Sequence, residues 1–305
     1  MAAERLYYTS SQLEFDAEIA EIQLVSKDEQ GQFWRVALNE TAFYPTGGGQ
    51  PHDTGTLIAI AKSGAVLEVP VELVEEDDAG EVWHYIRKPL VEGTEIQGRV
   101  DSARRIDHEQ QHSGQHLLSA MFLRELGMAT VSFHLGAESS TIDLDTKERP
   151  TDEQLTLVEN AVNRVVAEGR PVIVNWVQPE YAQEMLSRGD LRKIPDRPGR
   201  IRIVQMQGVE FNACGGTHVS NTGAIGGVLV RKLEKVKQGW RVEFCCGVRA
   251  TKAARRDYQT LTAVAKTLSV GAADVPARVA ALMEEKKAAA KELKKLRAML
   301  PEAAI

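Results

Sequence analysis

Histidine and cysteine residues with metal-ligand spacing are concentrated in two short stretches of this chain. The first stretch contains His108, His112 and His116, which follow one another at intervals of four. The second contains Cys214 and His218, separated by Gly-Gly-Thr. Because residues four apart lie one above the other on a helix, the three histidines predict a stripe along one helix face. These residue types at this spacing predict a metal site.

The donor set favours zinc over other metals. Two histidines of the first stretch, together with Cys214 and His218, would provide one thiolate and three imidazoles, which suit Zn²⁺. The thiolate argues against Mg²⁺ and Ca²⁺, because both prefer oxygen ligands. Five residues compete for four positions, and spacing leaves open both His108 with His112 and His112 with His116. We therefore expect one zinc ion per chain, with one of the five residues outside its ligand set.

A zinc peptidase is the main alternative for this metal site. The segment His108-Glu109-Gln110-Gln111-His112 matches the His-Glu-x-x-His pattern, in which the glutamate acts as general base. Glu109 would take that role here. This alternative leaves Cys214 and His218 unexplained, and thiolate ligation is unusual for such peptidases.

A glycine-rich loop in the N-terminal part is a second candidate site. The segment Phe43–Pro51 contains three consecutive glycines, the last two being Gly48 and Gly49, followed by Gln50. Because glycine has no side chain, the backbone N–H groups of this loop could approach a ligand closely. A glycine-rich turn is usually only a turn, but the flanking aromatic residues and Gln50 favour a functional loop. Gly48 and Gly49 are therefore predicted substrate contacts.

Three regions follow from the pattern of apolar residues. Residues 1–100 contain short strands separated by Gly, Asp and Asn, which predicts a small β-barrel or sandwich. Residues 101–247 mix helices and strands, which predicts an α+β domain with an antiparallel sheet. Residues 248–305 are helical throughout, and their leucine spacing predicts a short coiled-coil arm or an antiparallel hairpin. The expected fold class is α+β.

The same patterns predict individual elements. Strands are expected at residues 13–26, 33–38, 54–61, 65–73, 81–86, 94–100, 130–135, 140–144, 171–177, 201–206, 227–235 and 241–246. Helices are expected at residues 101–126, 151–168, 179–188, 248–267 and 275–300. Asp101 or Ser102 can cap the first helix, Gly127 can end it, and Thr151 can cap the second.

Composition limits the class of protein. The 305 residues are 43% hydrophobic and 26% charged, which is ordinary for a globular protein of about two domains. No run of eighteen apolar residues is present, so we expect no transmembrane helix and no membrane partner. With only three cysteines, Cys214, Cys245 and Cys246, we expect no disulfide framework and a cytoplasmic setting.

Charge is unevenly distributed along the chain. The net charge is −6, yet residues 249–305 contain twelve Lys or Arg against six Asp or Glu. A basic end on an acidic body would suit contact with a polyanion. On charge alone, a solvated helix explains the basic end better.

The motifs around the metal candidates resemble a known family. The segments Gln111–Ser119 and Cys214–His218, with Thr222-Gly223 after them, resemble the editing domain of alanyl-tRNA synthetase. The loop Phe43–Gln50 and the segment Val131–Gly136 are similar to the free-standing alanyl-tRNA editing proteins called AlaX. The helical end resembles the arm that follows editing in the synthetase and in longer AlaX members.

This resemblance, which covers roughly residues 4–250, implies hydrolysis of tRNA(Ala) mischarged with serine and also with glycine. It implies that the zinc ligands are His112, His116, Cys214 and His218. His108 is then left beside the ligands or in contact with substrate.

The resemblance also implies residues that contact the amino acid. It places Thr130, Ser132 and His134 near the aminoacyl pocket. A site that hydrogen-bonds a serine hydroxyl would reject alanine, because its polar groups would then lack partners. Thr130, Ser132 and Thr46 are candidates for that hydrogen bond. The predicted catalytic residues are His108, Thr46, Gln50 and Ser132.

The expected partner is the acceptor stem and 3′ end of tRNA(Ala). Lysine and arginine should line the path of the phosphates, while the RNA is recognised by shape, its single-stranded end and its 2′-hydroxyls. The candidate cations are Arg104, Arg105, Arg192, Lys193, Arg197, Arg200, Arg231 and Lys232. We also expect a homodimer through the helical arm. The alternative to an enzyme is a tRNA-binding module that contains zinc but has no turnover.

Overall fold

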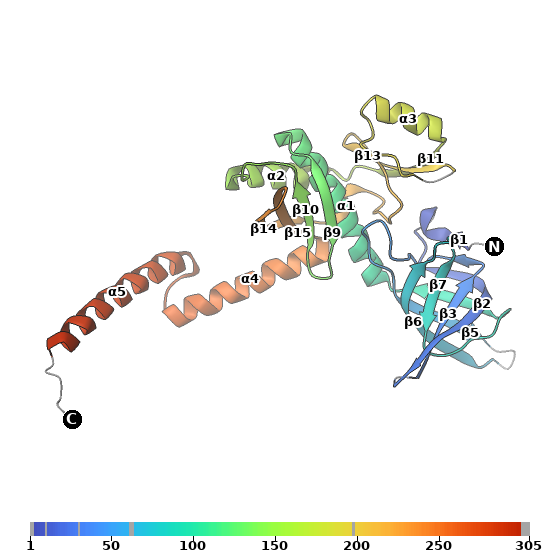
Figure 1. The fold of residues 1–305 in the computed structure, drawn as a ribbon, viewed down its shortest axis with the longest axis horizontal. Coiled ribbons are helices and arrows are strands. Elements are labelled where there is room, and N and C mark those ends of the chain that lie inside the picture. Colours follow the sequence, from blue (N-terminus) through green and yellow to red (C-terminus); the bar gives the residue numbers. More distant parts are fainter. Residues whose placement is uncertain (1–2, 10, 30, 61–63, 197–198, 300–305) are drawn as a thin grey trace. The chain divides into compact units, whose positions relative to one another are not determined.

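The computed structural model describes residues 3–9, 11–29, 31–60, 64–196 and 199–299 (Figure 1). The chain forms two compact units, Met1–Ala250 and Thr251–Ile305. The first unit contains both the region predicted as a barrel and the region predicted as the metal site. Antiparallel sheets and helices occur together in it, which confirms the predicted α+β class.

Six strands of the N-terminal region close into a barrel. Their order is β2 (Glu14–Asp28), β3 (Gly31–Leu38), β7 (Val82–Ile86), β6 (Val66–Glu76), β5 (Gly55–Ile60) and β8 (Glu95–Val100). Strand β8 pairs antiparallel with both β2 and β5, which closes the sheet. Alternate side chains point inward and form an apolar core that includes Val36, Leu38, Leu57, Val69 and Ile86. The prediction of a barrel or sandwich is thus resolved as a barrel.

Two short strands of the first unit were missed. Strand β1 (Glu4–Arg5) pairs in parallel with β4 (Glu40–Thr41). Strands of two residues carry no periodicity, so the sequence pattern does not reveal them.

Helix α1 (Ser102–Leu126) follows the barrel directly and carries the histidine stripe. Asp101 caps it, because its carboxylate accepts hydrogen bonds from the backbone N–H groups of Ala103 and Arg104. Gly127 ends it in a left-handed conformation, as predicted. The second half of α1 has an apolar face, on which Leu117, Leu118, Met121 and Phe122 are fully buried.

A four-stranded antiparallel sheet packs with α1 and α2 (Asp152–Glu168) around one apolar core. The strand order is β14 (Val228–Val236), β15 (Gly239–Cys246), β10 (Ser140–Leu144) and β9 (Thr130–Leu135). Thr151 caps α2 as predicted, and Gln154 completes a capping box with it.

A smaller sheet leads into the cysteine motif. It consists of β11 (Val172–Val177), β12 (Ile201–Met206) and β13 (Glu210–Ala213), all antiparallel. Helix α3 (Pro179–Ser187) shares a separate apolar cluster with this sheet, which contains Ala182, Met185, Leu191, Ile201 and Ile203. Strand β13 was not predicted, and it ends immediately before Cys214.

The second unit is helical, as predicted for the C-terminal region. Helix α4 (Gly247–Leu268) begins in the first unit and continues into the second, where a 3-10 turn at Ala272–Asp274 precedes α5 (Val275–Met299). Five large apolar side chains of the described part of α5 are at least 42% exposed: Val279, Met283, Leu293, Leu296 and Met299. Among the described residues, no helix is both long enough and apolar enough to cross a membrane.

Close packing at Gly114 generates a stability prediction. An alanine normally stabilises a helix by about 1 kcal/mol relative to glycine. At Gly114, however, a Cβ atom would collide with Sγ of the buried Cys246. Gly114→Ala is therefore expected to lower the free energy of unfolding by about 1–3 kcal/mol, measured by urea denaturation.

The control for Gly114→Ala is relief of the collision. The double variant Gly114→Ala with Cys246→Ala should be more stable than the sum of the two single effects predicts. Strict additivity of the two substitutions would contradict the packing argument.

Candidate metal centre and substrate site

Four predicted ligands converge on one point. One potential ligand atom from each of His112, His116, Cys214 and His218 lies within 4.8 Å of the others. The Sγ atom of Cys214 is 3.4 Å from Nε2 of His112 and 3.3 Å from Nε2 of His218. His108 lies outside this group. The structure therefore brings together the pair His112 and His116, not His108 and His112.

Two elements carry these four residues. His112 and His116 are one turn apart on α1, and their rings are stacked with centroids 5.1 Å apart. Cys214 and His218 lie in the loop after β13. The buried Arg202 on β12 shapes that loop, because its Nη1 donates hydrogen bonds to the carbonyl oxygens of Cys214 and Gly216 at 2.7 and 2.9 Å.

Each imidazole has a neighbour at Nδ1, which orients its Nε2 toward the centre. The Nδ1 atom of His112 is 2.8 Å from Oε1 of Gln50, and that of His218 is 3.1 Å from Oγ of Ser113. The Nδ1 atom of His116 is 3.5 Å from Oε1 of Glu210. Such partners on the far ring nitrogen are characteristic of metal-binding histidines.

The surroundings of the Nε2 atom of His116 indicate that these residues fit a metal. It is buried and has no hydrogen-bond partner within the described part of the chain. A buried polar atom without a partner is costly, and a cation at the centre would satisfy it. With one thiolate and three imidazoles, the donor set is consistent with zinc.

Protonation of the four residues depends on their burial and on one another. Burial by itself raises the pKa of the Cys214 thiol, but His112 and His218 beside it lower that pKa well below the ordinary value. Burial lowers the pKa of His218 to about 3. Burial also opposes a charge on His116, yet contact with Cys214 and Glu210 raises its pKa to about 10. A metal at the centre would therefore meet Cys214 as a thiolate and His218 as a neutral imidazole. Its binding would release the proton of His116.

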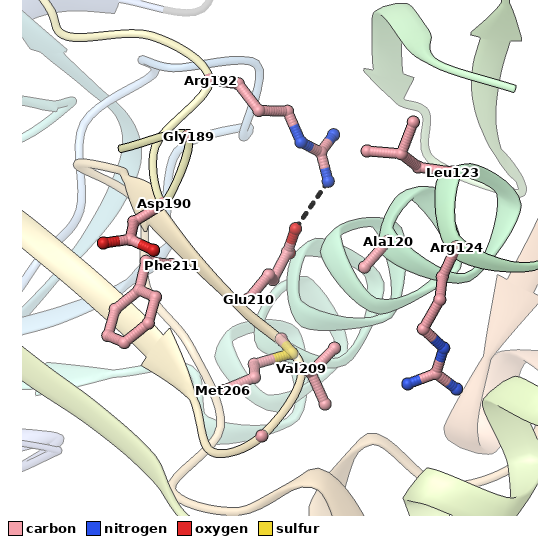
Figure 2. A pocket seen from close by; sticks show the side chains of 11 residues that line it. Ala120, Leu123, Arg124, Gly189, Asp190, Arg192, Met206, Val209, Glu210 and Phe211 are labelled. Carbon is pink, nitrogen blue, oxygen red and sulfur yellow. Dashed lines mark hydrogen bonds and ion pairs between the residues drawn. The ribbon is translucent and has the colours of Figure 1, made fainter. Parts of the chain in front are cut away.

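Glu210 connects the centre to an adjacent cavity. Figure 2 shows Glu210 and Arg192 joined across this cavity, which has a volume of about 400 Å³ beside α1. Nη2 of Arg192 is 2.7 Å from Oε2 of Glu210, while Oε1 of Glu210 faces His116. The sequence pattern does not reveal Glu210, because this residue lies on the short strand β13 and belongs to no motif.

The glycine-rich loop reaches the metal centre through Gln50. Gln50 is 1% exposed, and it contacts both His112 and Thr217. Gly48 and Gly49 are exposed in a turn closed by reciprocal backbone hydrogen bonds between Gly47 and Gln50. Thr46 is exposed and lies 3.1 Å from Nδ1 of His52.

The residues predicted on β9 lie on different faces of that strand. The ring of Phe133 is 6.1 Å from that of His112, so this side of β9 faces the centre. Because side chains alternate along a strand, the flanking Ser132 and His134 project from the other face. Both are exposed, and Oγ of Ser132 donates to Asp143 at 2.7 Å. This placement opposes the expected contact of Ser132 and His134 with an aminoacyl group.

Thr130 does face α1. Its Oγ1 donates to Oγ of Ser119 at 2.9 Å, and Nε2 of Gln115 donates to the same oxygen at 2.9 Å. A register irregularity in the pairing of β9 with β10 separates Thr130 from the alternation of the later residues. Gln115 and Ser119 were missed as site residues, although both lie on the same helix face as the histidines.

Arg105 and His108 belong to the contact between α1 and the barrel. Arg105 is 1% exposed, and its guanidinium pairs with Asp53 and donates to the carbonyl oxygen of Ala42 at 2.6 Å. Its prediction as a tRNA contact is wrong, because a buried guanidinium paired with Asp53 is not accessible to a phosphate. His108 faces Asp53 at 4.0 Å, and burial lowers its pKa to about 4. Since His108 faces Asp53 and lies outside the group of four converging residues, it is not positioned as a metal ligand.

The remaining predicted cations have different surroundings. Arg104 donates to the carbonyl oxygen of His52, and Arg200 donates to that of Trp176. Arg231 and Lys232 lie near Glu243 and Glu234. Lys193 is exposed, and Arg197 lies outside the described residues.

Glu109 does not take the geometry of a peptidase base. That alternative needs His108 and His112 on one metal, and the structure separates them. Glu109 instead lines a second cavity of about 400 Å³, together with Tyr8, Arg202 and His218. Burial raises the pKa of its carboxyl group to about 7.

Two family models match the chain. The model described as the threonyl and alanyl tRNA synthetase second additional domain matches residues 201–241, which include β12, β13 and the loop with Cys214 and His218. The model described as tRNA synthetases class II (A) matches residues 1–104, which include the barrel.

Curated relatives match more of the chain. The alanyl-tRNA editing protein Aarsd1 of Bos taurus is 37% identical over 243 residues, which cover 79% of this chain and 52% of the relative. Aarsd1 of Rattus norvegicus is 36% identical over 251 residues, covering 82% and 58%. By sequence, the chain is similar to alanyl-tRNA editing proteins over most of its length. An alanine–tRNA ligase of Pyrococcus furiosus is also similar, with 34% identity over 306 residues, 96% of this chain and 31% of the ligase. The chain thus spans between 31% and 58% of the length of these relatives.

The buried pair of Arg105 and Asp53 leads to a stability prediction. Arg105→Met keeps the aliphatic part of the side chain but leaves Asp53 buried without its cation. The free energy of unfolding is expected to fall by about 3–5 kcal/mol, measured by urea denaturation.

Arg99→Met is the matched control within the barrel. Arg99 and its partner Glu14 are 52% and 59% exposed, so the loss should stay below about 1 kcal/mol. If Arg105→Met and Arg99→Met lowered the free energy of unfolding equally, the buried pair would not be what holds α1 to the barrel.

Proposed function

We propose that this protein hydrolyses the ester bond of tRNA(Ala) mischarged with serine, and also with glycine. The observation that carries the proposal is the convergence of His112, His116, Cys214 and His218 in a chain whose relatives are named alanyl-tRNA editing proteins. This donor set suits zinc, and we expect one zinc ion per chain.

The chemistry is hydrolysis of an activated ester. A bound zinc ion would polarise the ester carbonyl or lower the pKa of a water molecule toward ~7. Cys214 and the three histidines would hold that ion, while Ser113 and Glu210 lie beside the outer ring nitrogens of His218 and His116. The protein then has to position the ester, since positioning and electrostatics supply much of the barrier lowering for such substrates.

Selection of serine over alanine requires a polar group that alanine leaves unpaired. The cluster of Gln115, Ser119 and Thr130 supports this role, because its members are hydrogen-bonded on the α1 face that carries the ligands. Oε1 of Gln115 is buried and has no hydrogen-bond partner among the described residues, so it is able to accept from a serine hydroxyl. The site would thus favour the hydroxylated amino acid.

Exposed lysine and arginine side chains would contact the phosphates of the acceptor stem. Within the first unit these include the exposed Lys193 and Arg200. The basic helices α4 and α5 are further candidates, since phosphate contacts need only accessible positive charge. We expect the protein to act in the cytoplasm, where its free cysteines stay reduced.

The central experiment is deacylation of Ser-tRNA(Ala) by wild type and by Cys214→Ala. Wild type should release serine, while Cys214→Ala should bind less zinc and lose activity by more than about 100-fold. Zinc content is measured on the same preparations as the rate. Cys245→Ala is the matched control, since Cys245 is buried but lies outside the ligand group, and it should retain both zinc and activity.

Two results would decide for the alternatives. If zinc-loaded wild type binds tRNA(Ala) but leaves the serine ester intact, the protein is a binding module and not a deacylase. If Glu109→Gln abolishes hydrolysis of a peptide substrate while Cys214→Ala does not, the peptidase alternative holds. We expect Glu109→Gln to retain deacylation.

Self-association through α5 is a separate part of the proposal. The exposed Val279, Met283, Leu293 and Leu296 recur at helical spacing and would be covered by a second copy. Wild type is therefore expected to sediment as a dimer at micromolar concentration. Leu293→Lys with Leu296→Lys should give a monomer, whereas Ala288→Lys with Ala298→Lys, off that face, should not. A monomeric wild type would contradict the expectation.

A further inference from the structure

Gln50 is the residue of the barrel region that touches the metal-binding group. It lies at the end of the glycine-rich loop and is buried among residues far from it in the sequence. Its side-chain amide contacts His112, 62 positions later, and Thr217, 167 positions later. One side chain therefore joins the loop, helix α1 and the segment between Cys214 and His218.

The contacts of Gln50 determine the orientation of its amide. The backbone N–H of Thr217 can only donate, and it lies 3.0 Å from Oε1 of Gln50. On the other side, Nε2 of Gln50 donates to Oγ1 of Thr217 at 2.8 Å. The acceptor end of the amide is therefore the end that faces His112.

This orientation fixes the tautomer of His112. Since Oε1 of Gln50 only accepts, Nδ1 of His112 at 2.8 Å must carry the proton and donate it. When the ring is neutral, the lone pair is therefore on Nε2, which lies 3.4 Å from Sγ of Cys214 and points into the ligand group. A neutral imidazole with this tautomer is ready to bind a cation through Nε2.

The same amide sets the position of the cysteine loop. At Gly216 a Cβ atom would lie 2.9 Å from Oε1 of Gln50 and would also collide with the ring of His112. The cysteine loop, the ring of His112 and the amide of Gln50 are thus in close contact.

We propose that Gln50 is a positioning residue of the metal centre. It holds His112 in the tautomer that binds through Nε2, and it holds the loop of Cys214 and His218 against α1. The barrel region therefore completes the metal site. In this proposal Gln50 acts through His112 and Thr217, which occupy both ends of its amide, and not as the catalytic residue that the sequence predicted. The inference rests on the metal-binding part of the proposed function and not on the identity of the substrate.

The test compares metal binding in three variants of the full chain. Gln50→Met has similar volume but cannot form the hydrogen bonds. Gln50→Glu can still accept from His112 and from the backbone of Thr217, whose hydroxyl can turn to donate. Gln32→Met is the control, since Gln32 is exposed on β3. Zinc affinity is measured by competition with a chelator, and the ligand geometry by the absorption spectrum of the Co²⁺-loaded proteins.

Gln50→Met is expected to weaken zinc binding by about 10- to 100-fold and to change the Co²⁺ spectrum. Gln50→Glu should restore the affinity to within about threefold of wild type, and Gln32→Met should match wild type. In ¹⁵N spectra of the zinc-loaded wild type, Nδ1 of His112 should be protonated and its signal should shift in Gln50→Met.

Two outcomes would overturn the inference. One is a Gln50→Met protein with the zinc affinity and Co²⁺ spectrum of Gln32→Met. The other is a Gln50→Glu protein that binds zinc as weakly as Gln50→Met, because hydrogen bonding to His112 would then not be the cause. Deacylation is not a readout here, so a wild type that binds zinc but spares Ser-tRNA(Ala) would refute the proposed function and leave this test intact.

Discussion

Helix α1 buries a row of polar side chains, and the need to satisfy them is the constraint on which the first unit depends. The row consists of Arg105, His108, Gln110, Gln111, His112, Ser113, Gln115 and Ser119. A buried polar group without a partner costs on the order of 1–3 kcal/mol, and a buried charge costs more. Their partners come from several elements: Asp53 and Gln50 from the barrel region, His218 from the cysteine loop, and the backbone of Cys246 at the end of β15. Polar contacts of one helix thus hold together segments that lie far apart in the sequence.

The metal centre is a product of the same packing. The ligands face one another because α1 presents two histidines a turn apart and because Arg202 on β12 holds the carbonyl groups of the cysteine loop. Partners on the outer ring nitrogens orient the imidazoles, and each partner comes from a different element: Gln50 from the barrel loop, Ser113 from α1 itself and Glu210 from β13. The barrel is therefore part of the site as well as a neighbouring fold.

Local periodicity accounts for the parts of the fold that the sequence predicted well. The six barrel strands, α1 with its cap at Asp101, and α2 with its cap at Thr151 all have patterns carried by residues adjacent in the chain. Strands β1, β4 and β13 were not predicted, because they have only two to four residues and form by pairing with another strand. The same distinction separates Arg105 from Arg104. Adjacent arginines look alike in a sequence, but only one of them meets a buried carboxylate from the barrel.

The sequence by itself determined the fold class, the main elements and the residue types of the metal site. Ligand spacing on a helix and in a short loop is a local property, and the donor chemistry belongs to the side chains themselves. Only the tertiary structure decided which histidines converge, since His108 meets Asp53 of the barrel while His112 and His116 meet Cys214 and His218. It alone revealed Gln50 and Glu210 as neighbours of the ligands, and it turned Ser132 away from them. The physical reason is that these roles depend on which distant polar group a buried side chain finds, and that choice is made only when the elements pack.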